Sequence, residues 1–272
     1  MTSMLGLNRF VGRISLVYAI AVVLIAGGAF AAEWMAPSRG VLLLTFDDDA
    51  IDSWLAQTNR LAHYGARVTF SPYGEITAAR AEKLLALKAA GHTVGIHTLG
   101  HRNTDGVTTA QQIAAYALEQ VKPQVDALAA YGHVVRTIAY PNNKHTAAVD
   151  AHLEANYGIR HFRATDLAAE QQFAAGAGKD LAANDACFTP VADIASFQVV
   201  NAVGCAGYYG TDMDVLCAGI RRAAANNEVL AVFSHDIRDS PSEVGMKTEW
   251  LETILATAAD AGVTMLGLDD LP

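Results

Sequence analysis

Hydrophobic and polar positions along the chain repeat with two different periods. Short apolar runs that end in polar residues predict buried strands, and longer stretches with apolar positions three and four residues apart predict amphipathic helices. The predicted strands are 40–46, 67–71, 93–97, 134–140, 159–163, 197–201, 229–234 and 263–268. The predicted helices are 50–63, 77–90, 108–131, 145–157, 212–226 and 247–261. Pro123 is expected to kink or divide the third of these helices.

The order of these elements indicates the fold class. Strands alternate with helices, and the strands are rich in Val, Ile and Leu, which is typical of a parallel sheet covered by helices. We predict a single α/β domain, a distorted (β/α)7-8 barrel of about seven or eight parallel strands. An open doubly wound sheet is the alternative, although no glycine-rich phosphate-binding sequence follows the first strand.

The N-terminal segment differs from the rest of the chain. Arg9 and Arg13 precede an almost unbroken apolar run, 14–30, which is followed by an A-x-A sequence that ends at Ala31. This order is typical of a secretory signal peptide, so we expect a secreted or periplasmic protein. An uncleaved membrane anchor is the alternative, because the apolar run could just span a bilayer. The predicted units are a signal peptide, 1–31, and a mature domain, 32–272.

Composition restricts the partners. The formal charge is -9, and loss of the two arginines would give a mature chain of -9 - 2 = -11, which argues against nucleic acid as a partner. Three cysteines, Cys187, Cys205 and Cys217, occur late in the chain without the C-x-x-C spacing of a zinc or redox site. Export would permit one disulfide, with any of three pairings, and a structural role is expected.

Polar residues of catalytic types follow several predicted strands. Asp47 and Asp48 follow the first, His97 and His101 the third, and His235 the strand 229–234. The carboxyl ends of parallel barrel strands share one face, where active sites lie. We therefore expect these side chains to converge, together with the loop that contains Tyr140, Pro141 and Asn142.

The residue types suit metal-assisted hydrolysis. Asp48, His97 and His101 offer one carboxylate and two imidazoles, a set that suits zinc, with cobalt or nickel as alternatives, and leaves a coordination position open. The spacing of the histidines is expected to place both on one side of a helical turn. Asp47 could act as a base and His235 as an acid. A backbone N–H of the 140–143 loop could stabilise an oxyanion, and Asp49 is expected to cap the next helix.

Four stretches resemble a known family. They are TFDDD at 45–49, RVTF at 67–70, GHTVGIHTLGH at 91–101 and VFSH at 232–235, and they resemble polysaccharide deacetylases of carbohydrate esterase family 4, the nodulation-factor-deacetylase homology domain. The resemblance implies a distorted barrel and metal-dependent removal of acetyl groups from a glycan. It also implies that Asp47 is the base, that His235 is the acid, and that the ligands are Asp48, His97 and His101.

The chain departs from the family pattern at several positions. Ala139 stands where the family has an arginine that orients the base, so Arg136 or Arg163 would have to replace it. Asn142 stands in place of a tyrosine whose backbone N–H forms the oxyanion hole, but a backbone donor survives that change. Asp49 replaces a glycine. The acidic segment that supports the catalytic histidine has no clear match; the candidates are Asp166, Asp212 and Asp214.

Three functional hypotheses follow. The leading one is a metal-dependent polysaccharide deacetylase of the cell envelope or exterior, acting on an N-acetylated rather than an O-acetylated glycan. The second is an amidohydrolase of the same fold that acts on a small amide or imide, because fold does not fix function. The third is a non-catalytic relative that binds metal and glycan.

Overall fold

The computed structural model describes residues 37–165, 185–196 and 199–272. The predicted signal peptide, 1–31, and Asp166 lie outside these residues. Within the described part of the chain, no helix has both the length and the apolar character needed to cross a membrane.

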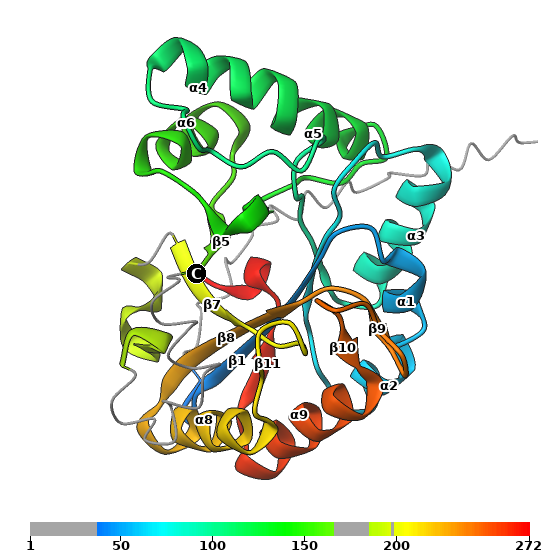
Figure 1. The fold of residues 1–272 in the computed structure, drawn as a ribbon, viewed down its shortest axis with the longest axis vertical. Helices are drawn as coiled ribbons and strands as arrows, with labels where there is room; N and C mark the ends of the chain where they lie inside the picture. Colours follow the sequence, from blue (N-terminus) through cyan, green and yellow to red (C-terminus); the bar gives the residue numbers. More distant parts are fainter. Residues whose placement is uncertain (1–36, 166–184, 197–198) are drawn as a thin grey trace, which may run out of the picture. The chain divides into compact units, whose positions relative to one another are not determined.

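Seven parallel strands form a closed ring. They are β1 (Val41–Asp47), β2 (Thr69–Ser71), β3 (Thr93–Val94), β4 (Thr137–Ala139), β5 (His161–Ala164), β7 (Val199–Gly204) and β8 (Glu228–Ser234). Their order is β3-β2-β1-β8-β7-β5-β4, and a parallel bridge between Ile96 and Ile138 joins the two ends (Figure 1). The predicted α/β barrel is confirmed.

Further strands extend the sheet locally. The strand β11 (Thr264–Leu266) pairs with the first half of β1, whereas β2 pairs with its second half. An antiparallel strand, β6 (Phe188–Pro190), lies along β8. Two short parallel strands, β9 (Ile237–Arg238) and β10 (Met246–Lys247), form a separate pair beyond the end of β8.

The helices occupy the predicted stretches, with two differences. They are α1 (Ile51–Leu55), α2 (Thr58–His63), α3 (Ala78–Ala89), α4 (Ala110–Tyr116), α5 (Lys122–Ala129), α6 (Ala147–Tyr157), α8 (Met213–Asn226) and α9 (Thr248–Ala261). The predicted helix 50–63 is two short helices. The predicted helix 108–131 is divided by a π-helical turn, η1 (Ala117–Val121), and Pro123 lies in the first turn of α5, where its missing N–H costs nothing.

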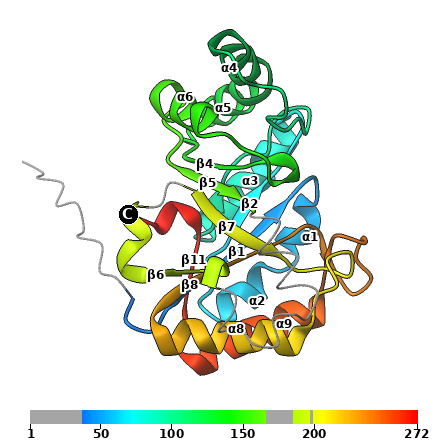
Figure 2. The ribbon, with the colours of Figure 1, turned by 60° about the vertical axis from the view of Figure 1, so that its left-hand side comes forward.

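The layers follow from burial. Every residue of β1 is buried, because β8 lies along one edge, β2 and β11 along the other, and helices cover it outside the ring. Helices α8 and α9 lie side by side beneath β1, β8 and β11, whereas α4, α5 and α6 lie beyond β4 and β5 (Figures 1 and 2). Short 3-10 turns complete the described fold: η2 (Pro141–Asn143), η5 (Asp185–Cys187), η6 (Val191–Ser196) and η7 (Leu268–Asp270).

The predicted helix cap at Asp49 is wrong. The N-cap residue of α1 is Ala50, without a side-chain cap. The Asp49 carboxylate lies 3.1 Å from the guanidinium of Arg80 on α3 instead.

Candidate metal and hydrolytic site

The candidate residues from three distant stretches lie together at the carboxyl ends of the barrel strands. Asp48 follows β1, His97 and His101 follow β3, and His235 follows β8. Asp48 Oδ1 lies 3.5 Å from His97 Nε2 and 3.4 Å from His101 Nε2. His235 Nε2 lies 3.7 Å from Asp48 Oδ2. The expected convergence is therefore present in the structure.

Asp48, His97 and His101 could hold a divalent cation. One ligand atom from each lies within 4.8 Å of the other two. Asp48 Oδ1 is buried and accepts no hydrogen bond, although a buried carboxylate oxygen without a partner is costly. A cation bound by these three atoms would remove that cost, so the residues fit the group that the sequence predicted.

His97 is prepared as a neutral ligand. Its Nδ1 lies 2.7 Å from the backbone carbonyl of Ala139 on β4, which orients the ring and directs Nε2 toward Asp48. Burial lowers the pKa of His97 to about 4, since desolvation penalises the charged imidazolium. The ring is therefore uncharged at neutral pH, with a lone pair on Nε2.

The loop between the two histidines is not the helical turn that their spacing predicted. Thr98 and His101 have φ angles of 67° and 50°, in the left-handed region that residues with a Cβ rarely adopt, and no helix covers 97–101. Asp48 has a φ of 75°. Non-glycine residues in this conformation cluster at functional sites, and two of the three candidate ligands are among them.

An arginine does contact Asp47, although Ala139 stands at the position of the family arginine; it is Arg163. It forms a buried ion pair with Asp47, with both side chains almost fully buried. Arg163 on β5 is the register partner of Ala139 on β4, so the guanidinium reaches Asp47 from the neighbouring strand. Arg136, the other arginine considered from the sequence, is exposed.

The same guanidinium contacts two further parts of the site. It donates a second hydrogen bond to Asn143 Oδ1 in the loop after β4. It also lies 4.8 Å from the centre of the Phe233 ring, two residues before His235. Cation–π contacts of this kind stabilise a desolvated guanidinium.

His235 is held at both its backbone and its ring. The indole N–H of Trp54 donates to the His235 carbonyl at 2.9 Å, and Trp54 is a fully buried core residue. The ring Nδ1 lies 2.9 Å from the carbonyl of Val244. The histidine is therefore oriented by a backbone carbonyl. Of the acidic candidates for this role, Asp212 caps α8. No sequence pattern pointed to Val244.

The loop expected to stabilise an oxyanion lies directly after β4. Asn142 and Asn143 have φ angles of 51° and 57°, so two consecutive residues are left-handed. The Tyr140 side chain is fully buried and its hydroxyl donates to Asp150 Oδ1, so it supports the loop from behind. Asp150 also accepts from His145 Nδ1 at 2.8 Å. Sequence reasoning missed Asp150, which follows the loop on α6 without any motif of its own.

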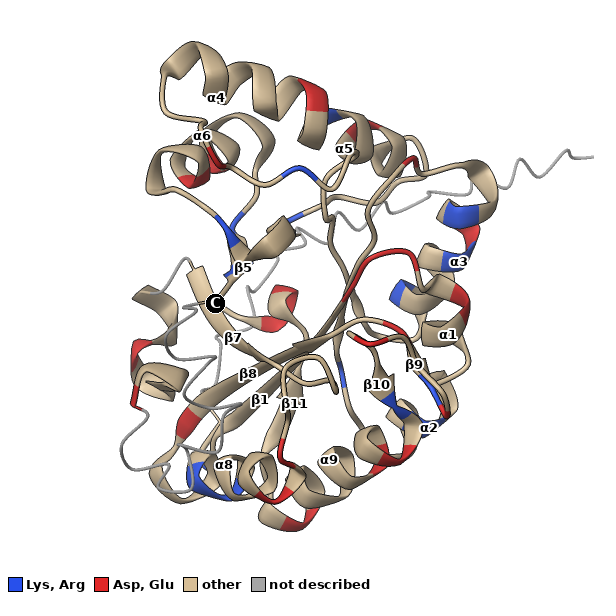
Figure 3. Ribbon diagram, viewed as in Figure 1, with Lys and Arg blue, Asp and Glu red and all other residues tan. Residues whose placement is uncertain are grey.

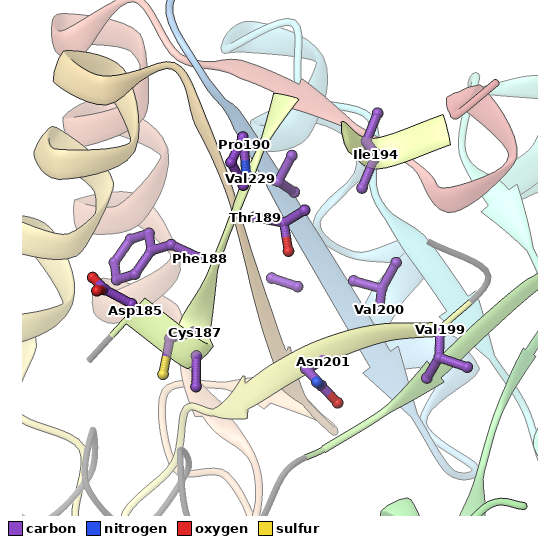
Figure 4. Close-up of a pocket in the computed structure, with 12 residues that line it drawn as sticks. Asp185, Cys187, Phe188, Thr189, Pro190, Ile194, Val199, Val200, Asn201 and Val229 are labelled. Carbon is purple, nitrogen blue, oxygen red and sulfur yellow. The ribbon is translucent and has the colours of Figure 1, made fainter. Parts of the chain in front are cut away.

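A separate hollow of about 200 Å³ lies beside β6, β7 and β8 (Figure 4). Its lining is mainly apolar, for example Val200, Ile194 and Val229, and it includes none of the candidate site residues. Lys and Arg residues are spread over several elements, among them α3 and α8 (Figure 3). Neither feature offers the combination of carboxylate and imidazole groups that the cluster around Asp48 has. Cys205 and Cys217 are buried free thiols, and Cys187 is buried as well.

Comparisons with known proteins agree with this geometry. The family model described as polysaccharide deacetylase matches residues 35–161, a range that contains Asp47, Asp48, His97, His101 and the 140–143 loop. It ends before Arg163 and His235. No curated protein matches the chain.

Solved structures share the fold. A family 4 carbohydrate esterase from Streptomyces lividans is 19% identical, with 84% of this chain and 92% of that chain covered and a TM-score of 0.53. A chitin deacetylase from Colletotrichum lindemuthianum is 18% identical, with 87% of this chain and 88% of that chain covered and a TM-score of 0.54. A peptidoglycan deacetylase from Bacillus subtilis is 14% identical, with 86% of this chain and 91% of that chain covered and a TM-score of 0.52. The motif match and the shared fold together confirm the resemblance of this chain to the polysaccharide deacetylases of carbohydrate esterase family 4.

Proposed function

We propose that the protein is a metal-dependent hydrolase that removes acetyl groups from a glycan, with N-acetyl groups favoured. The observation that carries this proposal is the placement of Asp47, held by Arg163, beside the Asp48–His97–His101 cluster, with His235 on another side of Asp48. A base, a cation site and an acid within one small volume are the parts that amide hydrolysis requires.

Asp47 is suited to the role of base by the asymmetry of its carboxylate. Oδ2 is bound by Arg163, whereas Oδ1 is buried and accepts no hydrogen bond. Arg163 thus fixes the plane of the carboxylate and leaves Oδ1 available to take a proton from the attacking water.

His235 is suited to the role of acid by its Nδ1 contact. Because Nδ1 is bound to the Val244 carbonyl, Nε2 is the atom that holds or releases a proton toward the site. Protonation of the leaving nitrogen by Nε2 would complete cleavage of the amide. In the loop that contains Tyr140, Pro141 and Asn142, the Asn142 N–H would stabilise the oxyanion, because Pro141 has no N–H and the Tyr140 N–H donates to the Arg163 carbonyl.

A divalent cation, when bound by Asp48, His97 and His101, would polarise the acetyl carbonyl and increase the acidity of water. Zinc is favoured by the mixed carboxylate and imidazole set, and cobalt or nickel would also suit it. His97 contributes its neutral Nε2, fixed in direction by the Ala139 carbonyl.

The proposed substrate is an acetylated glycan outside the cytoplasm. The structures of similar fold include a chitin deacetylase and a peptidoglycan deacetylase. The order of charged, apolar and small residues over 1–31 supports export to the periplasm or the exterior.

Acetate release from a panel of acetylated glycans, with and without a chelator, tests the proposal. We expect release that the chelator abolishes and added zinc restores. Asp47→Asn should lower the rate at least about 100-fold, because a positioned base contributes roughly 10²–10⁴-fold. Asp49→Asn is the matched control, since this neighbouring carboxylate pairs with Arg80 on the surface. Binding of metal and glycan without any acetate release would overturn the proposal, as would turnover of a cyclic imide in place of glycans.

A further inference from the structure

A second hollow, with a volume of about 430 Å³, lies beside the loop that orients His235. Its lining includes Gly207, Tyr208, Ser242, Glu243, Lys247 and Trp250. We call it the Tyr208 groove. None of these residues belongs to the proposed metal site or to the 140–143 loop.

Two aromatic side chains give the groove its apolar surface. Tyr208 is 70% exposed, one of the few large apolar side chains of the described residues that are this open to solvent. Trp250, at the start of α9, is half-buried, and the Lys247 ammonium lies 5.5 Å from the centre of its ring. One side of Trp250 packs against the core, and the residue also lines the groove.

The groove is fixed in shape before any ligand binds. Tyr208 N donates to the Glu243 carbonyl at 2.9 Å, which ties its two walls together. The second wall is closed by Asp236, which accepts from the Ser242 N–H and hydroxyl. A side chain at Gly245 would overlap Asp236, with only 2.1 Å to its Oδ1. A preformed groove loses little entropy when it is filled.

The chemistry of the lining favours a neutral, polyhydroxylated ligand. Exposed aromatic rings offer a flat apolar face, which matches the C–H face of a pyranose ring. Glu243, Ser242 and Lys247 surround the rings with acceptors and donors for hydroxyl groups. The carboxylate and the ammonium have opposite signs, so the groove does not select a charged ligand of either sign.

The walls of the groove contact residues that hold His235 of the proposed active site. Val244, next to Glu243 in the groove wall, supplies the carbonyl that holds His235 Nδ1. On the other wall, Tyr209 packs edge-on against both Tyr208 and Phe233, at 5.2 Å and 5.1 Å between ring centres. Phe233 lies two residues before His235. Both walls of the groove are therefore within one or two residues of a group that contacts or precedes His235.

We propose that the Tyr208 groove binds a sugar unit of the same glycan chain whose acetyl group is removed at the metal site, with Tyr208 as the stacking platform. This inference rests on the proposed function. It predicts that the protein prefers oligosaccharides long enough to reach from the Asp48 cluster to Tyr208.

The first experiment measures the KM for N-acetylated chito-oligosaccharides and acetylated xylo-oligosaccharides of one to about six sugars. Tyr208→Ala should raise the KM for the longest oligosaccharides about tenfold more than the KM for the single sugar, which corresponds to about 1.4 kcal/mol for the loss of one aromatic platform. Tyr131→Ala is the matched control, because Tyr131 is an exposed tyrosine beyond the end of α5. An equal change for all lengths, or no change, would overturn the inference, while acetate release from the single sugar by the wild type would uphold the proposed function.

The second experiment measures binding without turnover. In Asp47→Asn protein, the longest oligosaccharides should change the fluorescence of Trp250, and Trp250→Phe should remove that change while the other tryptophans remain. If neither oligosaccharide series alters the fluorescence, the groove does not bind glycan. Association of two protein copies that Tyr208→Ala abolishes, with no sugar-dependent fluorescence, would overturn the inference in favour of a protein interface.

Discussion

The two ends of the barrel strands carry similar side chains and use them differently. At the amino ends, the buried His92 accepts from the Val68 N–H, and His133 Nε2 lies 2.8 Å from the Val94 carbonyl. The 3-10 turn η7 closes this end, and the hydroxyls of Thr69, Thr93 and Thr137 all bond to its residues. These polar groups are satisfied locally.

At the carboxyl ends, polar groups converge and some of their atoms have no hydrogen-bond partner. Asp47 Oδ1 and Asp48 Oδ1 are buried without hydrogen bonds, and three histidines face Asp48. Natural proteins rarely tolerate such groups unless an ion, a substrate or a proton transfer uses them. The difference shows that a buried histidine indicates function only when its free nitrogen points at an unsatisfied partner.

His97 and His133 give the sharpest test of this difference, because each is buried with one nitrogen on a carbonyl of a neighbouring strand. His97→Gln should lower kcat/KM for acetate release at least about 100-fold, since a cation supplies several kcal/mol to the transition state. It should also remove the rise in melting temperature that added zinc gives the wild type.

His133→Gln is the counterpart at the amino end. It should lower the melting temperature and leave both kcat/KM and the zinc response close to those of the wild type. Equal losses of activity in the two variants would mean that the two ends are not functionally distinct.

The second prediction concerns the strand that supplies the arginine beside Asp47. Arg163→Ala should destabilise the fold by about 3–5 kcal/mol, because it leaves the buried Asp47 carboxylate without its counter-charge. Acetate release should fall about 100-fold as the base loses its orientation. The double variant Arg163→Ala, Ala139→Arg should recover part of both losses, since the two positions are register partners.

Stability and activity are measured separately, by denaturant unfolding and by initial rates at a temperature where each variant is folded. Arg136→Ala is the control, because this exposed arginine lies at the amino end of β4. If Arg163→Ala loses much less stability than expected and releases acetate at the wild-type rate, neither the stability of the fold nor the action of Asp47 depends on the ion pair.

Sequence reasoning was sufficient for the barrel and for the convergence of the candidate residues. Strand order is governed by parallel βα units, and the polar residues directly follow apolar runs, so their place at the carboxyl ends could be predicted. The barrel is confirmed, and Asp48, His97, His101 and His235 lie together. Their catalytic roles stay predictions.

What the sequence missed depends on contacts between distant residues. Arg163 could be named only as one of two alternatives, because strand register is decided by packing and not by local pattern. The left-handed conformations of Thr98 and His101 replaced an expected helical turn, since local propensity yields to the geometry of the loop. The partners Val244 and Asp150 carry no motif, and only the fold brings them to His235 and Tyr140.

The third prediction compares the two ends of a single strand, β4. Tyr140, just beyond its carboxyl end, donates to the buried Asp150, and Thr137, at its amino end, donates to Asp269. Tyr140→Phe should destabilise the protein by about 1–3 kcal/mol, since a buried carboxylate loses a donor. It should also lower kcat several-fold, because the oxyanion loop begins at this residue.

Thr137→Val should cost less, about 0.5–1.5 kcal/mol, because Asp269 is only half-buried. Its kcat should equal that of the wild type. A fall in kcat for Thr137→Val as large as that for Tyr140→Phe would show that β4 transmits any disturbance to the site, and the separation between the ends would then fail.

The smallest effect is expected on stability when the pH is lowered, through the titration of His92 at the amino end of the barrel. Burial, with a smaller contribution from the charge of Arg67, lowers the pKa of His92 from 6.5 to about 4. Between pH 6.5 and about 4 the unfolded chain therefore binds a proton that the folded protein does not, so stability falls as the pH is lowered through this window and levels off below it. His92→Asn keeps an acceptor for the Val68 N–H but cannot titrate, so its melting temperature should fall less between pH 7 and pH 4.5 than that of the wild type. An identical fall in both proteins would mean that His92 already carries its proton in the fold. The amino end would then contain a buried charge, as the carboxyl end does at Asp47, and the two ends would no longer differ in this respect.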